Sequence, residues 1–307
     1  MLLRGIALCL LMAAGCLARA DEAGPVATPL ELQVELHRRA FSCGSIDGVA
    51  GARTAAALRA FQRAAGLPGT GALDDATREV LTLSAPALEE YAFTAADLAG
   101  LHPVPDTWLE KSELDALNYA TGLELAAERF HASPNLLRRL NPGLDWDSLS
   151  AGTKINVPAV DHVVATGDPA SIVISLGAHT LEVIGSDGRV MAHFPVSVAR
   201  MARKRPVGEL HVTVVVSNPN YTFDPDLFPE SAEGQALGRK LVLPPGPNTP
   251  VGLVWIGLDR PRCGIHGTPE PEHVGRSESH GCFRLANWDV LTLAGLVSEG
   301  MSVTIEP

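Results

Sequence analysis

Residues 263–285 read CGIHGTPEPEHVGRSESHGCFRL, which gathers two cysteines and three histidines into one Gly-containing segment. A structural zinc site would need about four Cys, His or carboxylate ligands at tetrahedral spacing. The chain has no CxxC pair, and His280-Gly281-Cys282 is a poor pair of ligands for one metal. A cysteine nucleophile instead needs a thiol, an imidazole and backbone N–H groups for the developing oxyanion. The segment therefore favours thiol catalysis, without a metal or a cofactor.

Cys282 is the candidate nucleophile because Gly281 permits the backbone dihedrals that aim successive N–H groups at one point. His266 comes earlier in the same segment, just after a predicted strand, so a returning loop can place its ring beside the thiol. A single His near a Cys is usually structural, whereas two His motifs framing one Cys indicate catalysis. We expect an imidazolium beside Cys282 to lower the pKa of the thiol and favour the thiolate at neutral pH.

The chain around this segment is rich in β-branched runs. Gly, Asp and Pro turns separate IVISL, TLEVI, VMAHFPVSV, ELHVTVVV, LVWIGL and MSVTIEP, which all lie beyond residue 170. Alternation with a period of two predicts mainly antiparallel strands, and so a sandwich or barrel of about 135 residues. One helix is predicted at 288–299. A β domain that binds a substrate without chemistry is the alternative to an enzyme.

The motifs IHGT (265–268) and SHGCFRL (279–285) resemble the signature of the YkuD-type L,D-transpeptidase catalytic domain. The resemblance covers residues 169–307. It includes RPVGEL (205–210) and LPPGPNTPVG (243–252), which are similar to two further segments of that family. Phe283 departs from the family pattern, which usually has a small aliphatic residue there.

The resemblance implies a role for each residue of the catalytic motif. Cys282 would attack the carbonyl between diaminopimelate and D-Ala of a peptidoglycan tetrapeptide stem, release D-Ala and form a thioester. His266 would act first as general base and then as general acid, with the Gly267 carbonyl fixing its tautomer. The N–H groups of His280, Gly281 and Cys282 would form the oxyanion hole.

Two further residues are implied in substrate binding. Arg284 would pair with a substrate carboxylate, because a guanidinium fork matches that group well; a solvated surface arginine is the alternative. Ser279 would shape the loop against the substrate. Cys263 and His273 are expected to be scaffold residues.

Two small modules are predicted before this domain, which makes the chain a multidomain α+β protein. Residues 29–83 form a predicted helical module, whose turn glycines and Phe61-Gln62 pair resemble the peptidoglycan-binding domain. Residues 84–105, rich in Ala, Pro and Thr, are a predicted linker. Residues 106–160 are similar to a LysM module of mixed α/β structure, either glycan-binding or a spacer. We expect these modules to tether the enzyme to its polymer.

The first twenty residues predict export. Arg4 precedes an apolar stretch, and Ala18-Arg19-Ala20 is typical of a signal-peptidase site, so residues 1–20 are a predicted signal peptide. The alternative is a lipoprotein signal acylated at Cys16. Cleavage leaves Cys43, Cys263 and Cys282, so at least one thiol stays unpaired in an oxidising compartment. We expect the protein in the periplasm.

Composition excludes two classes of protein. A formal net charge of −11 argues against nucleic acid as a partner. No apolar run after the first twenty residues is long enough for a membrane span. The sequence thus predicts a periplasmic, monomeric L,D-transpeptidase that acts on peptidoglycan in cell wall biogenesis. An L,D-carboxypeptidase or crosslink-cleaving peptidase and a catalytically dead wall-binding protein are the alternatives. The acyl acceptor, a second stem or a lipoprotein, stays open.

Overall fold

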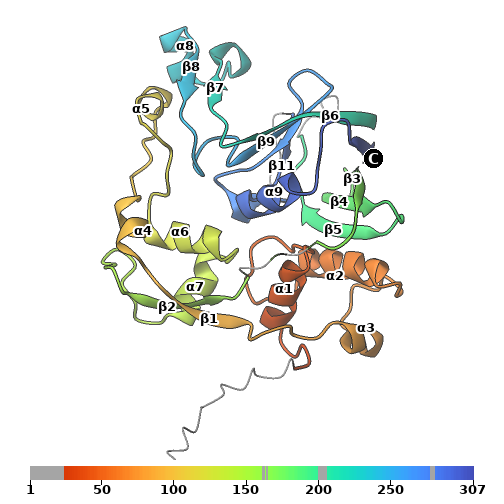
Figure 1. Cartoon of the computed structure of the whole chain (residues 1–307). Coiled ribbons are helices and arrows are strands. Elements are labelled where there is room, and N and C mark those ends of the chain that lie inside the picture. The colour runs from red at the N-terminus through yellow and green to blue at the C-terminus, as the bar shows by residue number, and fades with distance from the viewer. Residues whose placement is uncertain (1–23, 161–162, 164, 200–205, 277–280) are drawn as a thin grey trace, which may run out of the picture.

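The computed structural model describes residues 24–160, 163, 165–199, 206–276 and 281–307 (Figure 1). The predicted signal peptide and Cys16 lie outside this part of the chain. Within it, no helix combines the length and the apolarity that crossing a membrane requires.

The C-terminal part is built on an eight-stranded sheet with the order β11-β10-β9-β6-β12-β3-β4-β5. The pairs β10–β11 and β12–β3 are parallel, and the other neighbours are antiparallel. Helix α9 (Asn287–Ala294) packs against β9 and β10. The strands are β3 (Pro169–Ser175), β4 (Thr180–Gly185), β5 (Val190–Pro195), β6 (Gly208–Ser217), β9 (Val254–Leu258), β10 (Gly264–His266), β11 (Phe283–Arg284) and β12 (Ser302–Glu306).

The predicted mixture of helix and sheet is confirmed, and so is the mainly antiparallel pairing, but the strands form one eight-stranded sheet and not a two-sheet sandwich. Ile172 and Ile174 on β3 and Val303 and Ile305 on β12 are buried in its core. Because β3 and β12 lie at opposite ends of the domain in sequence, local alternation could not show that they pair in parallel.

A small flap projects from the sheet between β6 and β9. We define it as residues 221–243, which contain β7 (Tyr221–Phe223), the 3₁₀ helix η2 (Pro225–Leu227), helix α8 (Ala232–Leu237) and β8 (Leu241–Leu243). Strands β7 and β8 pair only with each other.

The N-terminal module consists of α1 (Pro29–Arg38), α2 (Ala52–Ala64) and α3 (Asp75–Val80). Thr28 and Glu31 form a capping box at the start of α1, which satisfies backbone N–H groups that the helix leaves free. The buried Gln33 side chain binds Asp47, the Val49 carbonyl and Thr54. These bonds hold the turn at Asp47-Gly48 against α1 and α2.

A second unit joins β1 (Leu88–Ala92) to β2 (Lys154–Pro158) in an antiparallel pair, with α6 (Gly122–Arg129) and α7 (Pro134–Leu140) beside it. In the chain, helices α4 (Ala95–Ala99) and α5 (Trp108–Ser112) come after β1 and before α6. The prediction of a linker at 84–105 was therefore wrong. Strand β1 and helix α4 occupy it, because Tyr91 and Phe93 pack with Phe130 in the core of this unit.

The modules are not independent units on a flexible tether. Ser42 N donates to His193 O at 2.8 Å, and His193 N donates to Ala40 O at 2.9 Å, so the N-terminal module covers the edge of the sheet at β5. Ile46 N donates to His131 O at 2.7 Å and joins the two N-terminal units. Backbone bonds at both junctions indicate one body.

Buried ionisable side chains lie where the three units meet. Glu128 of α6 accepts from the Asn287 amide at 2.8 Å and from the Tyr119 hydroxyl at 3.2 Å. Burial raises the pKa of Glu128 to about 8. It also raises the pKa of Asp289, which accepts from Ser42, to about 8. Both carboxyl groups are therefore largely protonated at neutral pH.

This protonation predicts how stability depends on pH. The folded chain holds the Glu128 proton with a pKa of about 8, well above the ordinary value of 4.5. The contribution of this bound proton to the free energy of unfolding is fully present below pH 4.5. It is lost as the pH rises to about 8, by as much as about 1.4 kcal/mol for each pH unit. Glu128→Gln should therefore flatten the fall of Tm between pH 5 and pH 8, measured by calorimetry.

Glu79→Gln on the exposed face of α3 is the matched control, and it should leave the slope of Tm against pH unchanged. An unaltered slope in Glu128→Gln would contradict the assignment of a buried, protonated carboxyl group.

Candidate active site

Strand pairing brings the candidate nucleophile and base together. In the parallel pair of β10 and β11, Ile265 lies opposite Phe283 and His266 opposite Arg284. Cys282 directly precedes β11 and so lies at the same edge of the sheet as His266. Both residues line a cleft of about 940 Å³, which the flap walls on one side through Tyr221 and Phe228.

His266 is held as a neutral base. Its side chain is buried at 5% exposure, and the ring stacks on Trp255 at 5.6 Å between centroids. Its Nδ1 lies 2.7 Å from the Gly267 carbonyl, which can only accept, so Nδ1 carries the proton and Nε2 keeps a free lone pair. Burial lowers the pKa of His266 to about 4. The imidazole is therefore uncharged at neutral pH.

Gly267 must be a glycine because the chain crosses itself closely there. A Cβ at this position would lie 2.2 Å from Oδ1 of Asn287. That Asn287 oxygen accepts from Leu253 N at 3.1 Å and ties β9 to α9. The carbonyl that orients His266 is thus fixed by close packing.

The Cys282 thiol donates to the Arg262 carbonyl at 3.5 Å. Burial raises the pKa of this thiol, and a backbone hydrogen bond from Gly264 and the charge of Arg284 offset that rise only in part. The expected thiolate–imidazolium pair is therefore wrong for the resting state. Burial disfavours the charged form of both partners, so the pair is neutral.

The lining of the cleft is cationic although the chain as a whole is acidic. Lys240, Arg260, Arg262 and Arg284 line it together with one carboxylate, Asp224, which Lys240 pairs at 2.8 Å. The Arg284 Nε atom is buried and has no hydrogen-bond partner among the residues the structure describes. This cleft suits a substrate with carboxylate groups.

The other sequence-predicted residues have different locations. Gly281 lines the cleft, whereas Ser279 and His280 lie outside the described residues. Cys263 is buried at the cleft wall, and burial raises the pKa of its thiol to about 11. His273 lies at the surface beside Glu270, at 3.3 Å.

Sequence patterns missed the aromatic part of this cleft. Trp255, Tyr221 and Trp108 all line it. The alternation of LVWIGL could have indicated that Trp255 and His266 share a face of neighbouring strands. No local signal could assign Trp108, which lies far from the catalytic motif in sequence.

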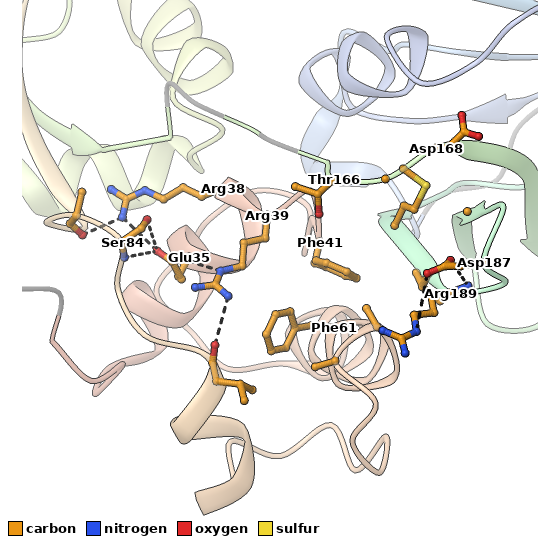
Figure 2. A pocket seen from close by; sticks show the side chains of 18 of the residues that line it. Glu35, Arg38, Arg39, Phe41, Phe61, Ser84, Thr166, Asp168, Asp187 and Arg189 are labelled. Carbon is orange, nitrogen blue, oxygen red and sulfur yellow. Dashed lines mark hydrogen bonds and ion pairs between the residues drawn. The ribbon is translucent and has the colours of Figure 1, made fainter.

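A larger hollow of about 1150 Å³ lies between the N-terminal module and β5, with the rings of Phe41 and Phe61 in its wall (Figure 2). Several of its charged groups are paired with one another. Glu35 binds both Arg38 and Arg39, and Arg39 also donates to the Val80 carbonyl. These contacts join α1 to the chain around α3, whereas the base and the thiol share the smaller cleft.

Comparison with known proteins agrees with this arrangement. Residues 169–305 match the family described as the L,D-transpeptidase catalytic domain, and residues 28–81 match a peptidoglycan binding domain. The YkuD protein of Bacillus licheniformis, named as an L,D-transpeptidase, is 31% identical over 185 residues, which cover 60% of this chain and 93% of the relative.

Two further matches carry the same name. YkuD of Bacillus subtilis is 30% identical over 183 residues, or 60% of this chain and 92% of that protein. A solved L,D-transpeptidase from Mycobacterium smegmatis is 21% identical with a TM-score of 0.36, over 52% of this chain and 65% of that one.

Proposed function

This chain belongs to the L,D-transpeptidase family, and from that premise we propose that it is a periplasmic acyltransferase that remodels peptidoglycan through a Cys282 thioester. The observation that carries the proposal is the pairing of β10 with β11, which brings a neutral imidazole and a thiol into one cationic cleft. The donor is a tetrapeptide stem, and the bond broken joins diaminopimelate to D-Ala.

The neutral pair sets the order of proton movements. As Sγ of Cys282 attacks the carbonyl carbon, Nε2 of His266 takes the thiol proton, so charge develops only with bond formation. The imidazolium then gives this proton to the leaving nitrogen, D-Ala departs, and the stem remains as a thioester. An acceptor amine attacks the thioester and loses its proton to His266, which passes that proton to the departing sulfur, so the Cys282 thiol is regenerated.

The resemblance to the family supplies the remaining roles. The N–H groups of Gly281 and Cys282, with that of His280, would bind the oxyanion. Arg284 lines the cleft and would pair with a carboxylate of diaminopimelate through its guanidinium group.

We also propose how the enzyme reaches an insoluble polymer. The N-terminal module matches a peptidoglycan binding domain, and the β1–α6–α7–β2 unit is a LysM-like candidate for binding glycan. Residues 1–20 would direct export to the periplasm. Binding of the polymer raises the concentration of stems near Cys282.

The test is incubation of the mature protein with a soluble disaccharide-tetrapeptide, followed by mass spectrometry. Release of D-Ala together with a dimer joined through diaminopimelate supports transpeptidation. Release of D-Ala with only free tripeptide would assign an L,D-carboxypeptidase. An absence of D-Ala release, with added amine acceptors as well, would overturn the proposal.

A further inference from the structure

A segment outside the catalytic domain packs on the catalytic flap. We call residues 104–118 the strap; it contains α5 and precedes the matched region at 169–305. Leu117 of the strap is fully buried with Phe223, Leu241 and Leu243 of the flap. The strap therefore supplies part of the core that the flap lacks by itself.

Trp108 is the central contact between the two segments. Its ring stacks on Phe223 with centroids 4.3 Å apart and planes 13° apart, and Lys111 Nζ lies 5.2 Å from the ring on its own helix. Trp108 also lines the cleft that contains Cys282 and His266. One side chain thus touches both the flap core and the cleft.

Hydrogen bonds fix the strap at both ends. At one end, the N–H groups of Trp108 and Leu109 donate to the Glu233 carboxylate of α8, each at 2.9 Å. At the other end, Leu117 N donates to Pro245 O at 2.9 Å, just beyond the flap. Gly246 permits this approach, because a Cβ there would lie 2.3 Å from the Leu117 carbonyl oxygen.

The flap has little of its own to hold its position. Its two strands pair over three residues each, and a two-stranded hairpin is marginally stable in water. The strap is a support because its far end is held by the loop that follows the flap and by α6: the Asn248 amide of that loop donates to Asn118 O at 2.8 Å and to Glu124 of α6 at 2.6 Å.

We infer that the strap is part of the substrate-binding machinery and that Trp108 is a positioning residue, which holds the flap where it closes the cleft around the acyl donor. The inference rests on the proposed function for the identity of that donor. Without Trp108, the flap must be ordered when the stem binds, and this cost appears in KM. The chemistry at Cys282 does not involve the indole ring.

The test compares Trp108→Ala with Trp108→Phe in the full-length mature protein. In Trp108→Ala, KM for D-Ala release from the soluble disaccharide-tetrapeptide should rise about tenfold, while kcat changes by less than about threefold. The rate at which iodoacetamide alkylates Cys282 should stay within about twofold of the wild-type rate, because this reagent is too small to need the flap for binding. Trp108→Phe keeps an aromatic ring against Phe223, so its KM should lie close to the wild-type value.

Trp146→Phe is the matched control, because Trp146 packs against the other core of the same unit. It should change neither KM nor kcat. An unchanged KM in Trp108→Ala would overturn the inference, as would an equal loss of kcat, alkylation and thermal stability. If Trp108→Ala does not fold, Glu233→Gln weakens the two backbone bonds while the ring remains, and it should raise KM in the same way.

Hydrogen exchange separates this inference from the proposed function. Peptides from 221–243 should exchange about tenfold faster in Trp108→Ala, and peptides from 169–185 should not change. This result is expected even if the wild-type protein releases no D-Ala, which would refute only the proposed function. Unchanged exchange in the flap would refute the role of the strap.

Discussion

Replacing Cys282 by alanine is expected to abolish D-Ala release from tetrapeptide stems while the fold stays intact. Without Sγ no thioester can form, and a lost nucleophile costs at least about 10⁴-fold in turnover. The thiol lies at the wall of a cleft and not in the centre of the core, so its removal leaves little empty volume. The measurement is D-Ala release by mass spectrometry, beside Tm by calorimetry.

Cys263→Ala is the matched control. Cys263 directly precedes β10 as Cys282 precedes the neighbouring β11, but the Cys263 thiol is buried with a pKa of about 11. It should keep D-Ala release within about threefold of the wild type. Measurable D-Ala release by Cys282→Ala would show that another group is the nucleophile. Loss of release in Cys263→Ala at unchanged Tm would move that role to Cys263.

The second large effect is expected for His266→Gln, which should slow acylation about 10²- to 10⁴-fold. The pH profile carries the sharper test. Because burial lowers the pKa of His266 to about 4, the wild-type base stays neutral at pH 6 and is lost only as the pH falls through about 4. The acidic limb of kcat/KM should therefore lie near pH 4, not near the ordinary histidine value of 6.5.

Acylation by His266→Gln should depend on pH in the alkaline range. Burial raises the pKa of Cys282, so without a base the thiol reacts only as alkaline pH ionises it, and the gap to the wild type should narrow there. His273→Gln, at the surface beside Glu270, should leave the profile unchanged. An acidic limb near pH 6.5 in the wild type would contradict the lowered pKa of His266.

Local sequence was sufficient to find the chemistry. Gly281-Cys282 and His266-Gly267 are short motifs, and close packing requires the glycine at 267, so the residue types themselves carry the signal. The β-branched runs predicted strands for the same reason, since burial on a pleated surface selects them residue by residue. The resemblance to the L,D-transpeptidase and peptidoglycan-binding families was confirmed on these motifs.

Other properties depend on which distant segments meet. The stacking of Trp108 on Phe223 and the contact of Glu128 with Asn287 join residues that lie far apart in the chain. Strand β1 looked like a linker because its partner β2 comes only after four intervening helices, α4 to α7. No periodicity within a short window reports such pairs, because each depends on the summed packing of the folded chain.

The protonation state of the site also differs between what the sequence predicted and what the folded structure shows. From sequence, a cysteine and a histidine in one segment suggested a charged pair, since a nearby imidazolium lowers the pKa of a thiol. The folded chain buries the imidazole and half-buries the thiol, and the loss of solvent disfavours charge on either one, so the resting pair is neutral. The sequence alone determined which residues can react and the class of domain that carries them. Only the tertiary structure decided their charge, the strap that supports the flap and the joining of the modules, because solvent exclusion and long-range packing exist only once the chain is folded.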